Sequence, residues 1–309
     1  TRQLSGMQYV SKRVMTRPTG AANYQPFELR TSITTTATQG IQHLARQASG
    51  TPREQFTALM SHQKNYLRWI DSRHQELLDA KRELNPDGRG PKDAVYRKYR
   101  WYAQQQSLLE AINSFEVFYK NTFINLGGAI QSYVPPEKVK GTVDAKTLWA
   151  TATPSSTVAL IFEHQLFHNL KTIDDLTNLL VGHRRYMPDN PAGLFYNKSR
   201  ALQAIFQIRH TLSHNQGRVT QSDMAKFAAL GYSVAQGEIL DPSSDHLGTV
   251  IREVLLQEVD QFTDWLLDKT AGYLTQRNRN HGTVLLVAHR DVIVSTVGTL
   301  PVIMGLPWQ

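Results

Sequence analysis

The sequence predicts a mainly α-helical protein, a helical bundle with short extended segments at both ends. Apolar residues recur at helical spacing over most of the chain between residues 51 and 280. Hydrophobic residues make up 40% of the chain and charged residues 19%, which excludes a disordered or collagen-like protein. Thr-rich and β-branched runs lie near the ends of the chain. We therefore expect an irregular arm over 1–50, a helical domain over 51–280 and an extended segment over 281–309.

Two long helices are expected first. Thr51 and Glu54 have the spacing of a capping box, in which each side chain accepts a hydrogen bond from the backbone of the other residue. The helix that they begin is expected to end at the breaker Asn-Pro-Asp-Gly over 85–88. A second long helix is expected over 93–124, and the glycine pair at 127–128 is expected to end it.

Shorter helices follow, and the period changes near the C-terminus. Helices are expected over 156–170, from Thr172 onward, over 192–213, over 220–230 and over 245–276. The runs 284–287 and 292–294 are rich in β-branched residues. Such runs favour extended backbone, so we expect a hairpin or a pair of edge strands there.

Charge and cysteine content limit the classes of function. Lys plus Arg is 34 and Asp plus Glu is 26, a net charge of +8, which favours a polyanionic partner such as nucleic acid. The chain has no Cys, which excludes disulfides, thiolate metal sites and a cysteine nucleophile. We recognise no signal peptide and no membrane span in the sequence. A cytoplasmic protein without a membrane partner is therefore the expectation.

The end of the helix over 192–213 carries the most informative residues. Arg209 falls on the apolar stripe of this helix, where a guanidinium needs an anion or a paired acceptor. His210 and His214 are four residues apart and share one face. Asn215 and Gly217 tolerate left-handed backbone and are expected to end the helix.

An arginine and a histidine at a helix end suit phosphate chemistry. The Arg209 guanidinium can bind two phosphate oxygens at once, and histidine is the side-chain type that most often transfers protons near neutrality. We expect His214 to activate the ribose 2′-OH and Arg209 to stabilise the charge that develops on the phosphorane. His210, Ser213 and Asn215 are expected to support the site, and no metal or cofactor is required. The alternative is a buried arginine ion pair beside a helix-capping histidine.

The stretch Arg-His-Thr-Leu-Ser-His at 209–214 resembles the Arg-x4–6-His motif of HEPN domains (higher eukaryote and prokaryote nucleotide-binding). The polar His210 after the arginine fits this family, and the turn over 215–219 resembles that of several members. The resemblance covers 190–220. It implies a bundle of four or five helices, a homodimer whose two motifs meet in one cleft, and metal-independent RNA cleavage. Such domains often act in toxins, antiphage systems or RNA-guided nucleases, so an antitoxin or a regulatory partner is also expected.

Two further patterns have plainer explanations. Arg68 and His74 also have the spacing of the motif, but His74 falls on the apolar face of a long helix, where a core or interface histidine is expected. His164 and His168 have a spacing that can bind a metal, but no third ligand is indicated. We expect a polar helix face there. The alternative is that Glu163 enters the cleft as an orienting carboxylate.

A basic and aromatic segment extends from Lys92 to Tyr102. Cations alternate there with aromatic residues, a pattern that suits phosphate contacts and base stacking, although Tyr99 and Tyr102 are also assigned to the apolar seam of their helix. The cations expected to contact RNA are Lys92, Arg97, Lys98, Arg100, Arg184, Arg185 and Arg218. The sequence thus predicts a metal-independent endoribonuclease. The alternative is a non-catalytic helical module that binds a nucleotide or dimerises through Arg209.

Overall fold

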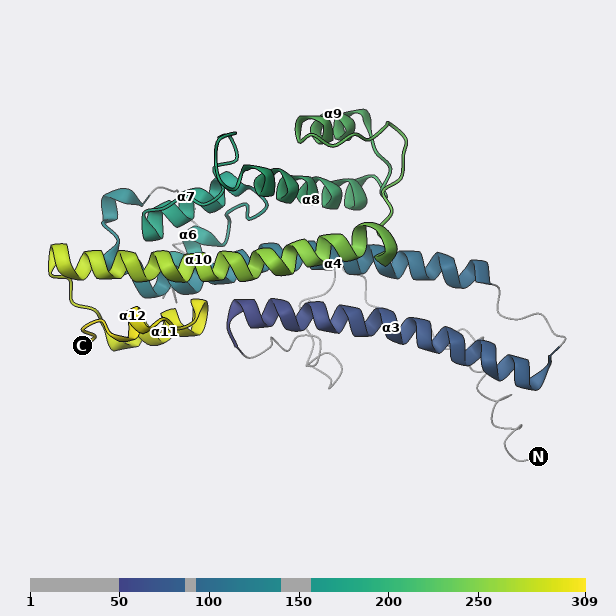
Figure 1. Ribbon diagram of the computed structural model, residues 1–309, viewed down its shortest axis with the longest axis horizontal. Helices are drawn as coiled ribbons and strands as arrows, with labels where there is room; N and C mark the ends of the chain where they lie inside the picture. The colour runs from purple at the N-terminus through teal and green to yellow at the C-terminus, as the bar shows by residue number, and fades with distance from the viewer. Residues whose placement is uncertain (1–49, 87–92, 140–156) are drawn as a thin grey trace, which may run out of the picture. The chain divides into compact units, whose positions relative to one another are not determined.

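The computed structural model describes residues 50–86, 93–139 and 157–309, and the structural statements below concern these residues. They form nine α-helices (Figure 1), and the only strand-like pairing among them is two isolated bridges. The prediction of a mainly α-helical protein is therefore confirmed. The arm over 1–50, apart from its last residue, and Lys92 lie outside the described residues.

Helix α3 (Pro52–Leu84) begins with the predicted capping box. The Glu54 backbone N–H donates to the Thr51 hydroxyl at 3.2 Å, and the Thr51 backbone N–H donates to the Glu54 carboxylate at 2.7 Å. The helix ends at Leu84, before the predicted breaker. The sequence therefore fixes both ends of α3 through local hydrogen bonding and backbone preference.

Helix α4 (Asp93–Ile130) continues through the glycine pair that was expected to end it. A Cβ atom on Gly127 would lie 2.7 Å from Cγ1 of Val158 and 2.9 Å from the ring of Phe162. Both neighbours belong to α6 (Thr157–Phe162), so this glycine permits a close helix crossing. The predicted end of α4 is wrong because tertiary packing explains the glycine without a chain break.

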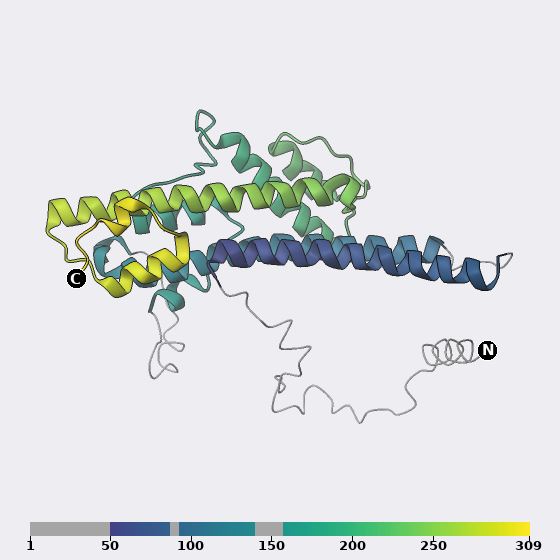
Figure 2. The same ribbon diagram turned by 60° about the horizontal axis from the view of Figure 1, so that its bottom comes forward.

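Three more helices, α7 (Leu170–Val181), α8 (Tyr196–His214) and α9 (Gln221–Ala229), lie near the predicted positions. A π-helical turn over 244–248 leads into α10 (Thr249–His281), which lies alongside α4 in both views (Figures 1 and 2). The core is aromatic, and Tyr119 of α4 contacts Phe262 of α10 with ring centroids 4.9 Å apart.

The predicted C-terminal hairpin is wrong, and so is the extended character of 281–309. The chain there forms α11 (Val287–Val297) and α12 (Pro301–Met304). Ile293 and Val297, four residues apart, are buried on one helical face, and burial of such a face outweighs the β preference of branched residues. The Leu286 N–H donates to the Tyr133 hydroxyl at 2.9 Å and anchors the start of α11.

The N-terminal half of α4 also differs from the prediction. Tyr99 and Tyr102 were assigned to the apolar seam, but their side chains are exposed. This half extends past α8 and α10 (Figure 1) and packs on α3 through Tyr96 and Arg100 instead. None of the helices described is both long enough and apolar enough to cross a membrane.

Candidate functional site

The C-terminal end of α8 is closed by a tight turn. Thr211 O accepts hydrogen bonds from the backbone N–H groups of Asn215 and Gly217, both at 3.0 Å. Left-handed backbone occurs at Gln216 (φ 51°) and Gly217 (φ 80°), whereas Asn215 has φ −118°. The prediction is confirmed for Gly217 and corrected for Asn215. A non-glycine residue with this backbone costs about 1 kcal/mol or more, so the surrounding hydrogen bonds must hold the turn.

Asn215 instead joins α8 to α9. Its side-chain amide donates to Asp223 at 2.9 Å, and the Gln207 amide donates to the same carboxylate at 2.8 Å. Burial alone would raise the pKa of Asp223, but hydrogen bonds from Thr220, Asn215 and Thr211 outweigh it and lower the pKa below its ordinary value. A charged, buried Asp223 therefore fixes the end of α8.

Arg209 is anchored by two side chains of α4. Its Nε donates to Oδ1 of Asn113 at 2.7 Å, and its Nη1 lies 3.4 Å from Oε1 of Glu116. The side chain remains 35% exposed. Arg209 is therefore not on a buried stripe as predicted, but at the edge of the helix interface, where it is both held and accessible.

Glu116 joins Arg209 to a third segment of the chain. Oε2 of Glu116 lies 3.4 Å from Nδ1 of His168, whose ring has an edge-on contact with Phe206. His168 follows the end of α6 in a turn, so His164 and His168 do not share a helix face as expected. We call Asn113, Glu116, His168 and Arg209 the Arg209 cluster.

Sequence analysis missed the contribution of Asn113 and Glu116. Their three-residue spacing places them on one face of α4, but nothing in the local pattern relates that face to α8. The only signal in the sequence was that the Arg209 guanidinium needs an anion nearby. In the structure, Glu116 is that anion.

His210 and His214 lie together on the exposed side of α8. Their ring centroids are 4.7 Å apart, which confirms that they share one face, and Ser213 beside them is also exposed. Five residues of α-helix separate Arg209 from His214, a rotation of about 140° around the axis. Within one chain the two side chains therefore leave α8 in different directions.

Two of the cations predicted to contact RNA are engaged elsewhere. Arg185 is buried, pairs with Glu258 at 3.1 Å, and lies over the ring of Phe195 at 4.4 Å. It is inaccessible to RNA, and that prediction is corrected. Arg100 donates two hydrogen bonds to Asp71, at 2.6 and 3.0 Å, so its guanidinium is largely occupied.

Three other predicted cations remain on the surface. Arg97 and Lys98 are exposed, and neither has a carboxylate partner within the described ranges. Arg218 is exposed and donates to the backbone carbonyl of Gly237 at 3.3 Å. In the second match to the motif, His74 is an interface histidine as expected, because it stacks on Tyr96 of α4 with ring centroids 3.7 Å apart, whereas Arg68 is exposed.

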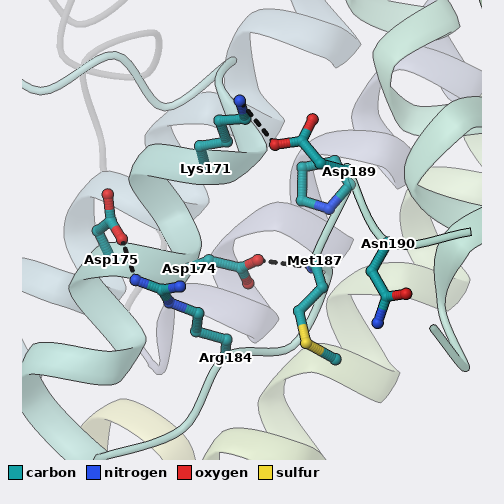
Figure 3. A pocket seen from close by; sticks show the side chains of 8 residues that line it. Lys171, Asp174, Asp175, Arg184, Met187, Asp189 and Asn190 are labelled. Atoms are coloured by element: carbon teal, nitrogen blue, oxygen red, sulfur yellow. Dashed lines mark hydrogen bonds and ion pairs between the residues drawn. The ribbon is translucent and has the colours of Figure 1, made fainter. Parts of the chain in front are cut away.

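A separate pocket of about 400 Å³ lies between α7 and the loop that follows it (Figure 3). Lys171 pairs with Asp189 at 2.7 Å, and Arg184, another predicted RNA contact, pairs with Asp175 at 3.1 Å. Each cation drawn in Figure 3 therefore pairs with a carboxylate that also lines the pocket.

Comparisons with models of protein families, with curated proteins and with solved structures find no match to this chain. Within the described ranges, no group of three His, Asp or Glu side chains is arranged to hold a metal ion. A functional assignment therefore rests on the side chains at the end of α8 and on their partners in α4.

Proposed function

We propose that this chain is a metal-independent endoribonuclease with a HEPN-like helical bundle, in which Arg209 and His214 are the catalytic residues. The observation that carries the proposal is a guanidinium, 35% exposed and held by Asn113 and Glu116, at the same helix end as an exposed pair of imidazoles. A surface cation fixed in position can bind a phosphate without first losing conformational freedom.

The reaction is an attack of the ribose 2′-oxygen on the adjacent phosphorus. His214 takes the 2′-OH proton, Arg209 stabilises the additional negative charge on the phosphorane, and the 5′-oxygen of the next nucleotide leaves with a proton from a second imidazole. The products are a 2′,3′-cyclic phosphate and a 5′-hydroxyl end. His210 supports the site beside His214, and Asn215 holds the end of α8 through Asp223.

We propose a homodimer with a composite site, and the geometry of α8 supports this proposal. Because Arg209 and His214 diverge by about 140° around the helix axis, one chain does not readily direct both at one phosphate. A second copy related by a two-fold axis supplies the complementary groups. We further propose that the enzyme is a toxin or an antiphage effector restrained by an antitoxin or another regulatory partner, since an unrestrained ribonuclease would damage its host.

Cleavage of RNA in the presence of EDTA tests the proposal. We expect the wild-type chain to cut single-stranded RNA, and Arg209→Ala and His214→Ala to lose this activity. His183→Ala is the matched control, because His183 is an exposed histidine outside the Arg209 cluster. The proposal is wrong if the wild-type protein leaves RNA intact, or if cleavage requires added metal.

The ion pair between Arg209 and Glu116 favours one competing function. In a non-catalytic module, Arg209 would bind a nucleotide or support dimer packing, and no RNA would be cut. Intact RNA together with loss of the dimer in Arg209→Ala would support the module.

A further inference from the structure

The exposed face of α4 extends from its N-terminal half to the Arg209 cluster. Tyr99, Tyr102, Gln106 and Asn113 are spaced by three, four and seven residues, so they lie on one side of the helix. The side chains of Tyr99 and Tyr102 are 63% and 58% exposed. At the other end of this face, Asn113 accepts the hydrogen bond from Arg209.

Helix α8 continues along α4 in the direction of the two tyrosines. Arg209 contacts Asn113, and the carbonyl of Leu212 accepts a hydrogen bond from Gln105, so the two helices are antiparallel. The chain from Arg209 to His214 therefore lies beside the part of α4 that leads to Tyr102. Eleven residues of α-helix separate Tyr102 from Asn113, about 16 Å along the axis.

Positive charge adjoins the tyrosines. Lys98 is exposed one helical turn before Tyr102 and has no carboxylate partner in the part of the chain that the structure describes. An exposed aromatic surface beside uncompensated cations suits unpaired bases and their phosphates.

We propose that this face of α4 docks single-stranded RNA, with bases stacked on Tyr99 and Tyr102 and the strand leading to Arg209 and His214. The proposal rests on the proposed ribonuclease function and assigns its substrate class as unpaired RNA. Stacking requires rings that a base can cover, and a paired base in a duplex does not expose its face. Lys98 would contact the phosphates of the stacked nucleotides.

The test is binding rather than cleavage. A short single-stranded oligouridylate with 2′-O-methyl riboses and a fluorescein label has no 2′-OH to react, so its anisotropy reports affinity alone. We expect the double variant Tyr99→Leu, Tyr102→Leu to bind about ten-fold more weakly or worse, because two stacking contacts are lost. The double variant with Phe at both positions retains most of the affinity, because the rings remain.

Tyr232→Leu is the matched control, since Tyr232 is 44% exposed and lies after α9, away from α4. An unchanged affinity of the Tyr99, Tyr102 leucine variant would overturn the proposal. An equal loss of RNA affinity in Tyr232→Leu would also overturn it. A lower molar mass in solution for the Tyr99, Tyr102 leucine variant would overturn it too, because that result would assign the face to a second copy of the chain. RNA that binds at the tyrosines but is never cleaved refutes the proposed catalysis alone, whereas cleavage that is indifferent to both tyrosines refutes the docking face alone.

Discussion

Two arginine–glutamate pairs of this protein have the same chemistry and opposite surroundings. Arg185 and Glu258 lie 3.1 Å apart in the core, with side chains 2% and 0% exposed. Arg209 and Glu116 lie 3.4 Å apart at the edge of the α4–α8 interface, with side chains 35% and 18% exposed. The first pair is sealed from solvent, and the second is open to it.

The surroundings determine what each arginine can do. Glu258 also pairs with Lys198 at 2.8 Å and accepts a hydrogen bond from Tyr186 at 2.7 Å, so Arg185 belongs to a closed network. Burial raises the pKa of Tyr186 well above its ordinary value, with a further contribution from Tyr119 and Glu258, so the hydroxyl stays protonated and donates. Arg209 has no such enclosure, and a phosphate can reach it. The comparison teaches that burial, not residue type, separates an arginine that is available only to the fold from one that remains open to an anion.

The largest expected effect on stability comes from breaking the sealed pair. Glu258→Gln leaves Arg185 as a buried charge without its counter-ion, which costs about 3–5 kcal/mol. Urea unfolding of the variant at neutral pH measures this loss. A loss below about 1 kcal/mol would mean that the network is open to water and that the contrast between the two pairs is false.

The open arginine is expected to affect chemistry instead. Arg209→Ala lowers RNA cleavage about 100-fold or more, because a positioned cation no longer stabilises the phosphorane, yet unfolding free energy falls by about 1 kcal/mol at most. Cleavage rates and urea unfolding of the same preparation measure both effects. The opposite pattern, large destabilisation with cleavage retained, would make Arg209 a structural residue like Arg185.

A third carboxylate, Asp223, is buried but hydrogen-bonded rather than ion-paired. Asp223→Asn is expected to cost about 1–2 kcal/mol at neutral pH, because the capping box of α9 and the contact with Asn215 weaken. The folded-state pKa of Asp223 is lowered. The ionised carboxylate therefore contributes fully to the free energy of unfolding above the unfolded-state pKa of about 4, and this contribution is lost as pH falls through the folded-state pKa.

The difference in unfolding free energy between wild type and Asp223→Asn, measured at pH 7 and at pH 3, is therefore expected to shrink on acidification. Asp268→Asn is the control, because Asp268 is exposed and pairs only with the neighbouring Lys269 among the described residues. A difference that is the same at both pH values, or that grows on acidification, would show that Asp223 is not held as a carboxylate.

The smallest effect is expected at Glu116. Glu116→Gln removes the charge but keeps the shape, and Arg209 retains its hydrogen bond to Asn113, so the unfolding free energy falls by about 1 kcal/mol or less. Parallel urea unfolding of this variant and of Glu258→Gln compares the contributions of the two ion pairs to the free energy of unfolding. Similar losses in the two variants would remove the distinction between the two pairs.

Local signals predicted the start of α3 and the turn that ends α8. The capping box at Thr51 and the glycine after α8 each depend on residues within a few positions of one another. The helical C-terminal segment was not predictable in this way, because its residues prefer extended backbone and are held by burial against the bundle.

The same difference between local signals and long-range packing applies to the candidate site. The motif at the end of α8 is contiguous, so Arg209 and the paired histidines were found from sequence, whereas the exposure of Arg209 was not. The partners of Arg209 were not, because Asn113 lies 96 residues away in the chain and meets it only through helix packing. Arg184 is exposed and Arg185 is buried, although they are adjacent in the sequence. The local sequence does not show which of the two is accessible.

The most direct test of the account is the chemistry of the RNA ends produced in EDTA. The wild-type chain is predicted to leave 2′,3′-cyclic phosphate and 5′-hydroxyl ends, and His214→Ala is predicted to leave the same RNA uncut. Ends that carry a 5′-phosphate, or an RNA that the wild-type chain does not cut at all, would contradict a reaction initiated by the 2′-hydroxyl at Arg209 and His214.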